Sequence, residues 1–286
     1  MSENIAFLTT IFPTNENYLY DFFNSLNRQT FKDFDVVVVN DNYKNFSKIK
    51  DKFSDLNIKE LKYSDTPLRN REHGINFILD NDYDIVIFGD SDDYFSFNRV
   101  EVIIEKLVHY DIIVNDLSIF NEKEIYEKKY FSHRIKNNTE ITIDFVKDKN
   151  IFGMSNTALR VKSLGNIIYD SELIALDWYI FSLALLKSGV ALFTNETQTF
   201  YRQYDENTVG IGKLNKGIIL KGISVKLKQY ELLSIEDSQF KAYYNEMTIL
   251  SNVIKNNKML DMVMSQKISY PLWWEEVKLF RKENEN

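Results

Sequence analysis

The sequence predicts an α/β fold in which a mainly parallel β-sheet is flanked by helices, with a helical extension at the C-terminal end. Short apolar runs alternate over residues 1–118 with segments whose apolar residues recur every three or four positions. This alternation is typical of strand–helix–strand units. Successive valines at 36–39 indicate a strand buried on both faces, as parallel strands are. Helical spacing dominates from residue 211 onward.

The elements of the first half follow from local signals in chain order. Asn15 is placed to cap a helix whose apolar residues, at 19, 22, 23 and 26, form one buried face. Pro67 suits the first turn of a second helix, and a third helix has apolar residues at 100, 103, 104 and 107. The predicted strands are residues 5–11, 34–39, 58–61, 85–88 and 112–114.

The second half departs from this rhythm. Residues 119–140 are charged and rich in asparagine, so we expect a surface excursion or a hairpin there. Beyond them, helical and strand periodicity predicts a strand over 152–160, a buried helix over 173–187, a strand over 190–195, a polar strand-to-loop segment over 197–204 and a helix over 232–250.

Composition excludes several classes of function. The 286 residues include no cysteine, which excludes a thiol nucleophile, a disulfide framework and a cysteine-based zinc site. His73, His109 and His133 are too far apart in the sequence to suggest a metal triad. The net charge of -7 disfavours a general nucleic-acid binder. Catalysis must therefore depend on carboxylates, hydroxyls or a bound metal.

Neither a membrane span nor a secretory signal is expected. The longest apolar stretch, 173–193, contains Asp177 and Lys187, and a charge near the centre of a bilayer is costly. The first residues, Met-Ser-Glu-Asn, lack the basic region of a signal peptide. We expect a cytoplasmic protein, with peripheral contact at the inner face of a membrane as an open alternative.

Three carboxylates, Asp90, Asp92 and Asp93, follow the predicted strand at 85–88 directly. Residues two apart in an extended segment point the same way, so Asp90 and Asp92 can face one point in space. Two hard oxygen donors suit Mg²⁺ or Mn²⁺, and open α/β sheets bind ligands at the carboxyl ends of their strands. The alternative is a solvated acidic turn or a helix cap.

Five segments, taken in order, resemble the family 2 glycosyltransferases, which have the GT-A fold with its Rossmann-like sheet. They are residues 27–41, ending Val-Val-Asn-Asp; 71–75, Arg-Glu-His-Gly-Ile; 88–93, Phe-Gly-Asp-Ser-Asp-Asp; 175–178, Ala-Leu-Asp-Trp; and 201–207, Tyr-Arg-Gln-Tyr-Asp-Glu-Asn. The resemblance covers about residues 4–212. It implies a transferase domain over 1–210, with a nucleotide-binding half at about 1–118 and an acceptor half at about 140–210, followed by a helical region over 211–286.

The resemblance also implies how a UDP-sugar would be bound. Asp41 would read the uracil, and the backbone at Thr9 and Thr10 would lie close to the nucleoside. Arg71 would lie near the base or the diphosphate, and Asp90 would approach the ribose.

The resemblance assigns the remaining chemistry to two carboxylates. Asp92 would hold the Mn²⁺ or Mg²⁺ that bridges the diphosphate. Asp177 would be the general base that deprotonates the acceptor hydroxyl. Weaker candidates of the same site are Asp93, Arg202, Tyr204, Lys213 and Lys216.

The chain departs from the family pattern at four positions. Asn40 stands where an acid is frequent, and Glu72 replaces a common Asn. Leu176 replaces the Glu that usually precedes the catalytic Asp, and Tyr204 replaces a frequent His. Lysines between 213 and 228, a stretch without an acidic residue, are available to bind the diphosphate or an anionic membrane surface.

Each candidate has a purely structural alternative. Asp177 would then form a salt bridge, with Arg160 or Arg202 as its partner, and Arg71 would be a helix charge paired with a nearby acid. Asp41 would close a turn or cap a helix. The lysines would form a solvated helix face, and we expect Trp273 and Trp274 to pack against a terminal helix.

The leading interpretation is a metal-dependent, inverting glycosyltransferase that uses a nucleotide-sugar in bacterial surface glycan or glycoprotein synthesis, with a saccharide, lipid-linked or protein acceptor. A sugar nucleotidyltransferase is the enzymatic alternative, disfavoured because the first strand leads into Thr-Thr-Ile-Phe-Pro and not into a Gly-rich phosphate loop. The non-enzymatic alternative is a degenerate transferase that binds a nucleotide-sugar without turnover.

Overall fold

The computed structural model describes residues 3–121, 123–203, 215–254, 257–265 and 268–277. The described strands are β1 (Ile5–Ile11), β2 (Asp35–Asn40), β3 (Asn57–Lys62), β4 (Ile85–Phe88), β5 (Tyr94–Phe95), β6 (Ile112–Phe120), β7 (Ile125–Glu127), β8 (Thr139–Ile141), β9 (Thr157–Arg160) and β10 (Ala191–Arg202). The α-helices are α1 (Glu16–Asn27), α2 (Phe46–Lys52), α3 (Pro67–Asp80), α4 (Arg99–Leu107), α5 (Ile143–Val146), α6 (Leu176–Ser188), α7 (Lys216–Glu236), α8 (Phe240–Val253) and α9 (Asn257–Met264), with short 3₁₀ helices η1 (Phe131–His133) and η2 (Val161–Ser163).

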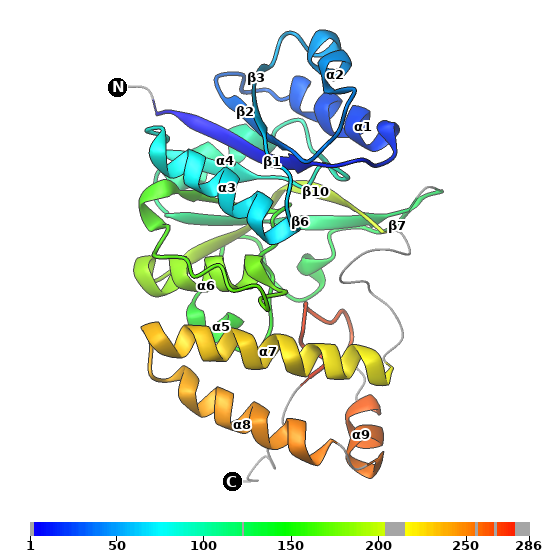
Figure 1. The fold of residues 1–286 in the computed structure, drawn as a ribbon, viewed down its shortest axis with the longest axis vertical. Coiled ribbons are helices and arrows are strands. Elements are labelled where there is room, and N and C mark those ends of the chain that lie inside the picture. Colours follow the sequence, from blue (N-terminus) through cyan, green and yellow to red (C-terminus); the bar gives the residue numbers. More distant parts are fainter. Residues whose placement is uncertain (1–2, 122, 204–214, 255–256, 266–267, 278–286) are drawn as a thin grey trace.

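The strands form one mixed sheet, in the order β3-β2-β1-β4-β9-β6-β10-β5, with β7 and β8 attached to β6 and β10. Strands β3, β2, β1 and β4 are parallel, as the alternating pattern predicts. Strand β9 pairs antiparallel with both β4 and β6, so the sheet is less parallel than the sequence led us to expect. The α/β class itself, with helices on both faces and a helical C-terminal region, is confirmed (Figure 1).

The two faces of the sheet carry separate cores because alternate strand residues point to opposite sides. Phe7, Val36 and Ile87 face α1, α2 and α4. Leu8, Val39 and Phe88 face α3 and α6. The valine run is buried on both sides, as a parallel strand requires.

Local signals located the helix starts well. The Asn15 side chain accepts a hydrogen bond from the backbone N of Asn17 at the start of α1. Thr66 caps α3, with Pro67 at the first turn. The expected excursion over 119–140 contains β7, which pairs antiparallel with the end of β6 and so forms a hairpin.

Predictions that depended on long-range pairing were less accurate. The strand expected over 152–160 is only Thr157–Arg160, because residues before it form a buried loop in which the Asn156 amide donates to the carbonyls of Asn115 and Ile151. The two segments expected over 190–204 are one strand, β10, with a register shift between Thr194 and Gln198.

The helical C-terminal region packs beneath α6 (Figure 1). The single helix expected over 232–250 is divided, because α7 ends at Glu236 and α8 begins at Phe240. After α9, the chain returns to the sheet domain, where Trp273 forms a β-bridge with Asn150. Among the helices described, none is both long and apolar enough to cross a membrane.

Candidate active site

The carboxyl ends of the parallel strands β1, β2 and β4 meet at one edge of the sheet, beside α3. A pocket lies there, and its lining includes Thr9, Thr10, Asn70, Arg71, Gly89 and Asp90. Close packing shapes its floor: a Cβ at Gly89 would lie 2.4 Å from the ring of Phe7, and one at Gly74 would lie 2.9 Å from Leu8. The position matches the rule that open α/β sheets bind ligands at the carboxyl ends of their strands.

Asp41, directly after β2, is oriented by two side chains. Its Oδ1 accepts a hydrogen bond from Ser64 Oγ at 2.5 Å, and its Oδ2 accepts one from Asn70 Nδ2 at 2.9 Å. Asn70 is itself buried, and its amide makes two further bonds with the backbone of Asp65. Asn70 was not among the predicted site residues, although it directly precedes the family-like segment 71–75.

Asn40, one of the four departures from the family pattern, closes the turn before the site. Its amide donates to the carbonyl of Tyr43 and to Glu60, while its Oδ1 accepts from the backbone N of Tyr43. The amide therefore supports the strand end that presents Asp41, and its role there is structural.

Arg71 and Asp90 form an ion pair in which Arg71 Nη2 lies 3.3 Å from Asp90 Oδ1. The side chains are 35% and 34% exposed, so both remain accessible to a ligand in the adjoining pocket. Arg71 is thus a helix charge paired with an acid, as its structural alternative predicted. The acid, Asp90, is itself a site candidate.

The acidic turn over 90–93 is fixed by bonds from distant segments. Ser91 Oγ donates to the carbonyl of Thr10 at 2.8 Å, and the backbone N of Asp93 donates to the carbonyl of Asp90 at 3.2 Å. Arg202 donates from its backbone N to Asp93 Oδ1 and from Nε to the carbonyl of Asp92. These contacts hold the turn in place and leave Asp92 partly exposed.

Two of the weaker candidates are therefore buried: Asp93 is the last residue of the turn, and Arg202 packs against it. Asp93 is 1% exposed, and burial, followed by the charges of Asp92 and Asp90, raises the pKa of its carboxyl well above the usual value. The Arg202 guanidinium pairs with Asp21 at 2.7 Å and lies over the rings of Tyr18 and Phe120. Both positions indicate a structural contribution to the site.

Arg99 is a buried cation under the same turn. Its Nη2 donates to the carbonyl of Phe88 at 2.8 Å, and its Nε donates to Asn115 Oδ1 at 3.0 Å. Burial lowers its pKa to about 9, against the opposing effect of Asp93 and Asp90, so it stays cationic at neutral pH. No sequence signal identifies Arg99, because it is on α4 and its partners are on the strands β4 and β6.

Asp177 lies in the first turn of α6, where the charges of Arg71 and Asp90 act on its carboxylate. Its Oδ1 accepts a hydrogen bond from the backbone N of Trp178 at 2.8 Å. The residue is partly exposed, and desolvation of its carboxyl raises the pKa to about 6; Arg71 opposes this shift and Asp90 adds to it. The expected alternative, a salt bridge to Arg160 or Arg202, is wrong in the described part of the chain, since these arginines pair with Glu3 and Asp21.

Tyr201, in β10, feels the charges of both Asp177 and the acidic turn. Burial raises the pKa of its phenol well above the usual value, and the charges of four carboxylates raise it further. These carboxylates are Asp93, Asp90, Asp92 and Asp177. Tyr201 therefore stays neutral at physiological pH.

The carboxylates of Asp90 and Asp92 suit a cation whose remaining ligands come from the substrate. In the described residues, no group of three or more His, Asp or Glu side chains is arranged to hold a metal ion by itself. Mg²⁺ is commonly held by one or two carboxylates together with substrate phosphates. The partly exposed Asp92, with Asp90 two residues before it, provides that kind of incomplete set.

The predicted lysine cluster is divided by the fold. Lys216 is exposed at the first residue of α7, whereas Lys226 is buried and Lys228 pairs with Asp170, Glu172 and Glu231. The expectation that lysines up to 228 are available to a diphosphate is therefore wrong for the last two. Tyr204 and Lys213 lie outside the described residues.

The chain is similar to known proteins in sequence and in fold. The family described as glycosyl transferase family 2 matches residues 10–168, more than half of the chain. The glycosyltransferase GlyA of Streptococcus pneumoniae is 28% identical over 214 residues, which are 68% of this chain and 30% of GlyA. The chain thus spans less than a third of that curated relative.

Solved structures share the fold at low identity. S. aureus TarS 1–349 in complex with UDP-GlcNAc has a TM-score of 0.62 at 16% identity, covering 93% of this chain and 76% of that one. GalNAc-T7 with UDP, GalNAc and Mn²⁺ has a TM-score of 0.56 at 11% identity, covering 87% and 54%. These likenesses confirm the GT-A fold.

Proposed function

Because the chain belongs to glycosyl transferase family 2, we propose that it transfers a sugar from a UDP-linked donor to an acceptor hydroxyl, with inversion at the anomeric carbon. The protein is a glycosyltransferase by family; the donor, the metal, the stereochemistry and the acceptor are the proposal. The observation that carries it is the convergence of Asp177 with the Arg71–Asp90 pair and the acidic turn, beside a pocket at the carboxyl edge of the sheet.

We assign the nucleoside to the pocket beside β1 and α3. Asp41 would accept a hydrogen bond from the uracil, with Asn70 and Ser64 orienting its carboxylate. The backbone at Thr9 and Thr10 would lie along the nucleoside, and Asp90 would contact the ribose. Arg71 would place its positive charge near the diphosphate while keeping its contact with Asp90. The fold-level likeness to TarS, whose structure holds UDP-GlcNAc, supports a uridine donor.

Asp92, with Asp90 beside it, would hold Mn²⁺ or Mg²⁺. When bound, such a cation stabilises the negative charge that collects on a leaving diphosphate. The incomplete donor set supports this assignment, and the GalNAc-T7 structure contains Mn²⁺ together with UDP.

Asp177 would act as the general base. A base works best when its pKa lies near the operating pH, and burial in the first turn of α6 raises that of Asp177 to about 6. The carboxylate would take the proton from the acceptor hydroxyl as that oxygen attacks the anomeric carbon. Attack on the face opposite the leaving diphosphate inverts the configuration. Tyr201, as a neutral phenol, would donate a hydrogen bond among the surrounding carboxylates.

We place this reaction in the cytoplasm, including the inner face of the membrane, in bacterial surface glycan or glycoprotein synthesis. The acceptor is a saccharide, lipid-linked or protein hydroxyl. The bacterial glycosyltransferase GlyA supports the bacterial setting.

The proposal is tested with a panel of nucleotide-sugars, each with and without Mn²⁺, measured by thermal shift and by release of nucleoside diphosphate. A ligand that binds only the native state at 100 times its Kd stabilises it by about 2.7 kcal/mol. We expect a UDP-sugar to raise the Tm in the presence of Mn²⁺, and UDP to be released on turnover.

Asp92→Asn should abolish the Mn²⁺-dependent part of that stabilisation without lowering the Tm of the free protein, because Asp92 is partly exposed. Undiminished Mn²⁺-dependent UDP binding by this variant would contradict the metal assignment. Release of pyrophosphate from a nucleoside triphosphate would favour a nucleotidyltransferase. Binding of a UDP-sugar without turnover, with acceptors supplied, would favour a degenerate transferase.

A further inference from the structure

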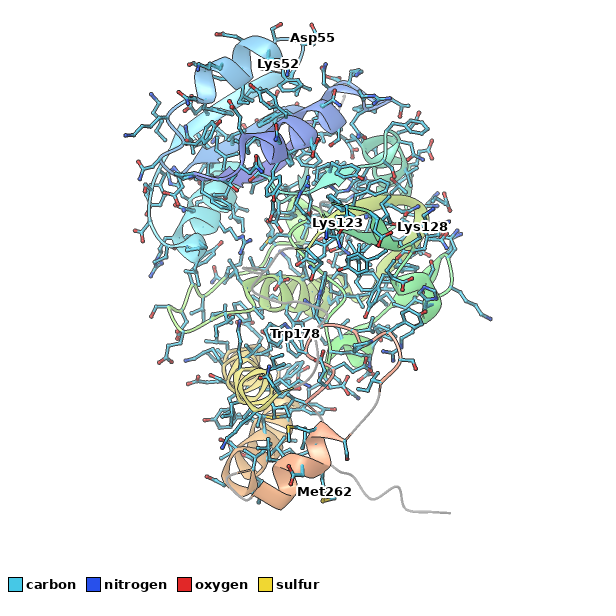
Figure 2. All side chains as sticks on the ribbon, turned by 90° about the vertical axis from the view of Figure 1, so that its right-hand side faces the viewer. Lys52, Asp55, Lys123, Lys128, Trp178 and Met262 are labelled. Atoms are coloured by element: carbon cyan, nitrogen blue, oxygen red, sulfur yellow. The ribbon has the colours of Figure 1, made fainter. Side chains whose placement is uncertain are left out.

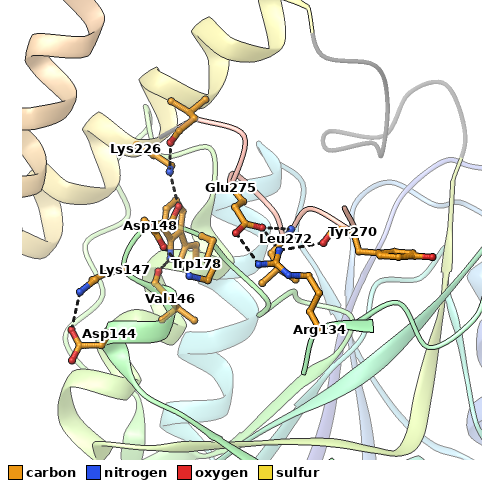
Figure 3. Close-up of polar contacts among 12 residues, drawn as sticks. Arg134, Asp144, Val146, Lys147, Asp148, Trp178, Lys226, Tyr270, Leu272 and Glu275 are labelled. Carbon is orange, nitrogen blue, oxygen red and sulfur yellow. Dashed lines mark hydrogen bonds and ion pairs between the residues drawn. The ribbon is translucent and has the colours of Figure 1, made fainter. Parts of the chain in front are cut away.

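Trp178, the residue after Asp177, joins the first turn of α6 to the C-terminal region. The side chain is 1% exposed, and its Nε1 donates to the carbonyl of Val146 at 2.8 Å (Figure 3). Its ring belongs to a small apolar cluster with Ala175, Val225 of α7 and Trp274. Figure 2 shows Trp178 at the level where the sheet domain meets the C-terminal helices.

Lys226 of α7 forms a second link at the same place. It is 1% exposed, and its Nζ donates to the carbonyl of Asp148 at 2.5 Å and to that of Val277 at 2.6 Å (Figure 3). Burying an ammonium group is costly unless it is hydrogen-bonded. This lysine therefore holds three segments together: α7, the residues after α5, and the C-terminal segment 270–277.

The C-terminal segment is itself anchored to the sheet domain. Glu275 is 1% exposed, forms an ion pair with Arg134, and accepts a hydrogen bond from the backbone N of Leu272 at 3.0 Å (Figure 3). Gly222 of α7 permits close approach on the other side, since a Cβ there would lie 2.6 Å from Val277 Cγ2. The segment is thus held between α7 and η1.

We propose that Trp178 and Lys226 are positioning residues for Asp177, so that the packing they hold between α6, α7 and the C-terminal segment governs the turnover rate of the transfer, while these two residues take no part in donor binding. This inference rests on the proposed role of Asp177 as general base. Asp177 is the residue before Trp178, so any shift of that ring is transmitted through one peptide unit to the base. Asp41 follows β2, and its partners are Ser64, before α3, and Asn70 of α3; these residues share none of the bonds of Trp178 or Lys226 described above.

Loosening this link has two consequences for Asp177. A small displacement of a catalytic group, of about 1 Å, can cost roughly 100-fold in rate. Water that enters the loosened turn would also reduce the burial that raises the pKa of Asp177 to about 6. The charged and titratable groups that face Asp177 are Arg71, Asp90 and Tyr201, and they are unchanged by substitutions at 178 or 226.

The test compares Trp178→Phe and Lys226→Met with Lys221→Met. Phenylalanine keeps an aromatic ring in the cluster but removes the bond to Val146. Lys226→Met keeps an unbranched apolar chain up to the position of Cε and removes both bonds that Nζ donates to carbonyls. Lys221 is exposed on the same helix, so Lys221→Met is the matched control. For each protein the measurements are kcat, the KM for the UDP-sugar, the pH profile of kcat and the Tm.

We expect Trp178→Phe and Lys226→Met to lower kcat by roughly 10- to 100-fold, to leave the donor KM within about twofold of the wild-type value, and to move the acid limb of the kcat profile to lower pH. Lys221→Met should match the wild type in all these measurements. If Lys226→Met does not fold, Trp178→Phe alone is compared with the wild type and decides the proposal.

A purely structural role would give a different pattern. A lowered Tm with an unchanged kcat and pH profile, or a loss of kcat that is matched by an equal rise in donor KM, would overturn the proposal. If Asp177→Asn retains normal turnover, the proposed base is wrong. The Trp178 and Lys226 variants test a different statement, namely whether these two residues position Asp177.

Discussion

Asp41 and Asp177 are both carboxylates of the candidate site, but their surroundings differ in kind. Asp41 accepts hydrogen bonds from Ser64 and Asn70, side chains that lie within 30 positions along the chain. Asp177 lies among apolar residues of α6, and burial sets its pKa. The segments that hold its turn come from as far away as residue 277.

This difference shows how one site combines two requirements. A carboxylate that recognises a nucleoside must be held in one orientation, which hydrogen bonds from side chains achieve. A carboxylate that takes a proton needs a raised pKa, which burial provides. We therefore expect changes near Asp41 to alter donor affinity, and changes near Asp177 to alter turnover.

The largest expected effect is that of Asp177→Asn. Removing a general base should lower kcat by roughly 100- to 10,000-fold, while the affinity for the UDP-sugar stays close to that of the wild type. Transfer to a hydroxyl acceptor, donor binding and Tm are measured on the same preparation. Near-normal transfer, or a lowered Tm that accounts for the loss, would remove Asp177 from the mechanism and direct attention to Asp170 and Glu172.

The next effect is a pH dependence of turnover. The base must be deprotonated, so kcat should fall about tenfold per pH unit below the Asp177 pKa of about 6. Stability should change in the opposite direction. A raised native pKa contributes stability that is fully present below the unfolded value and is lost as the pH rises through about 6. Urea titrations of wild type and Asp177→Asn between pH 4 and pH 8 measure this contribution, and identical pH profiles would contradict the assigned shift.

Asn70→Ala should have an intermediate effect, confined to donor binding. It removes a charge-assisted hydrogen bond to Asp41, and we expect a rise of roughly tenfold in the Kd for UDP, or about 1.4 kcal/mol. Asn76→Ala, at an exposed position of the same helix, is the control. Calorimetric titration with UDP measures the change. A drop in kcat at unchanged affinity would show that the two ends of the site are not separable in this way.

Lys216→Gln should have the smallest effect. Lys216 is exposed, and exposed charges contribute about 0–1 kcal/mol and are screened by salt. We expect about a twofold change in UDP-sugar affinity at low salt, vanishing at high salt. Lys241→Gln, at an exposed position of α8, is the control. No change in affinity or in liposome binding would assign Lys216 to a solvated helix face.

The sequence by itself determined the elements that depend on neighbouring residues. Helix starts at Asn15 and Pro67 follow from side chains that bond or shape the adjacent backbone. The buried strand of valines, β2, and the acidic turn after β4 follow from apolar periodicity and from turn residues. The same local patterns, through the family resemblance, were enough to select Asp41, Arg71, Asp90, Asp92 and Asp177 as site candidates.

Only the tertiary structure decided what depends on segments far apart in the chain. The antiparallel place of β9, the buried Arg99 under the acidic turn, and the contacts of Asn70 with Asp41 have no signal in local periodicity. Lys226 appeared in the sequence as one of several exposed lysines, yet it is buried against two carbonyls. Spacing along a chain reports which residues share a helix face or a strand, whereas burial and pKa depend on which other segments pack against that face.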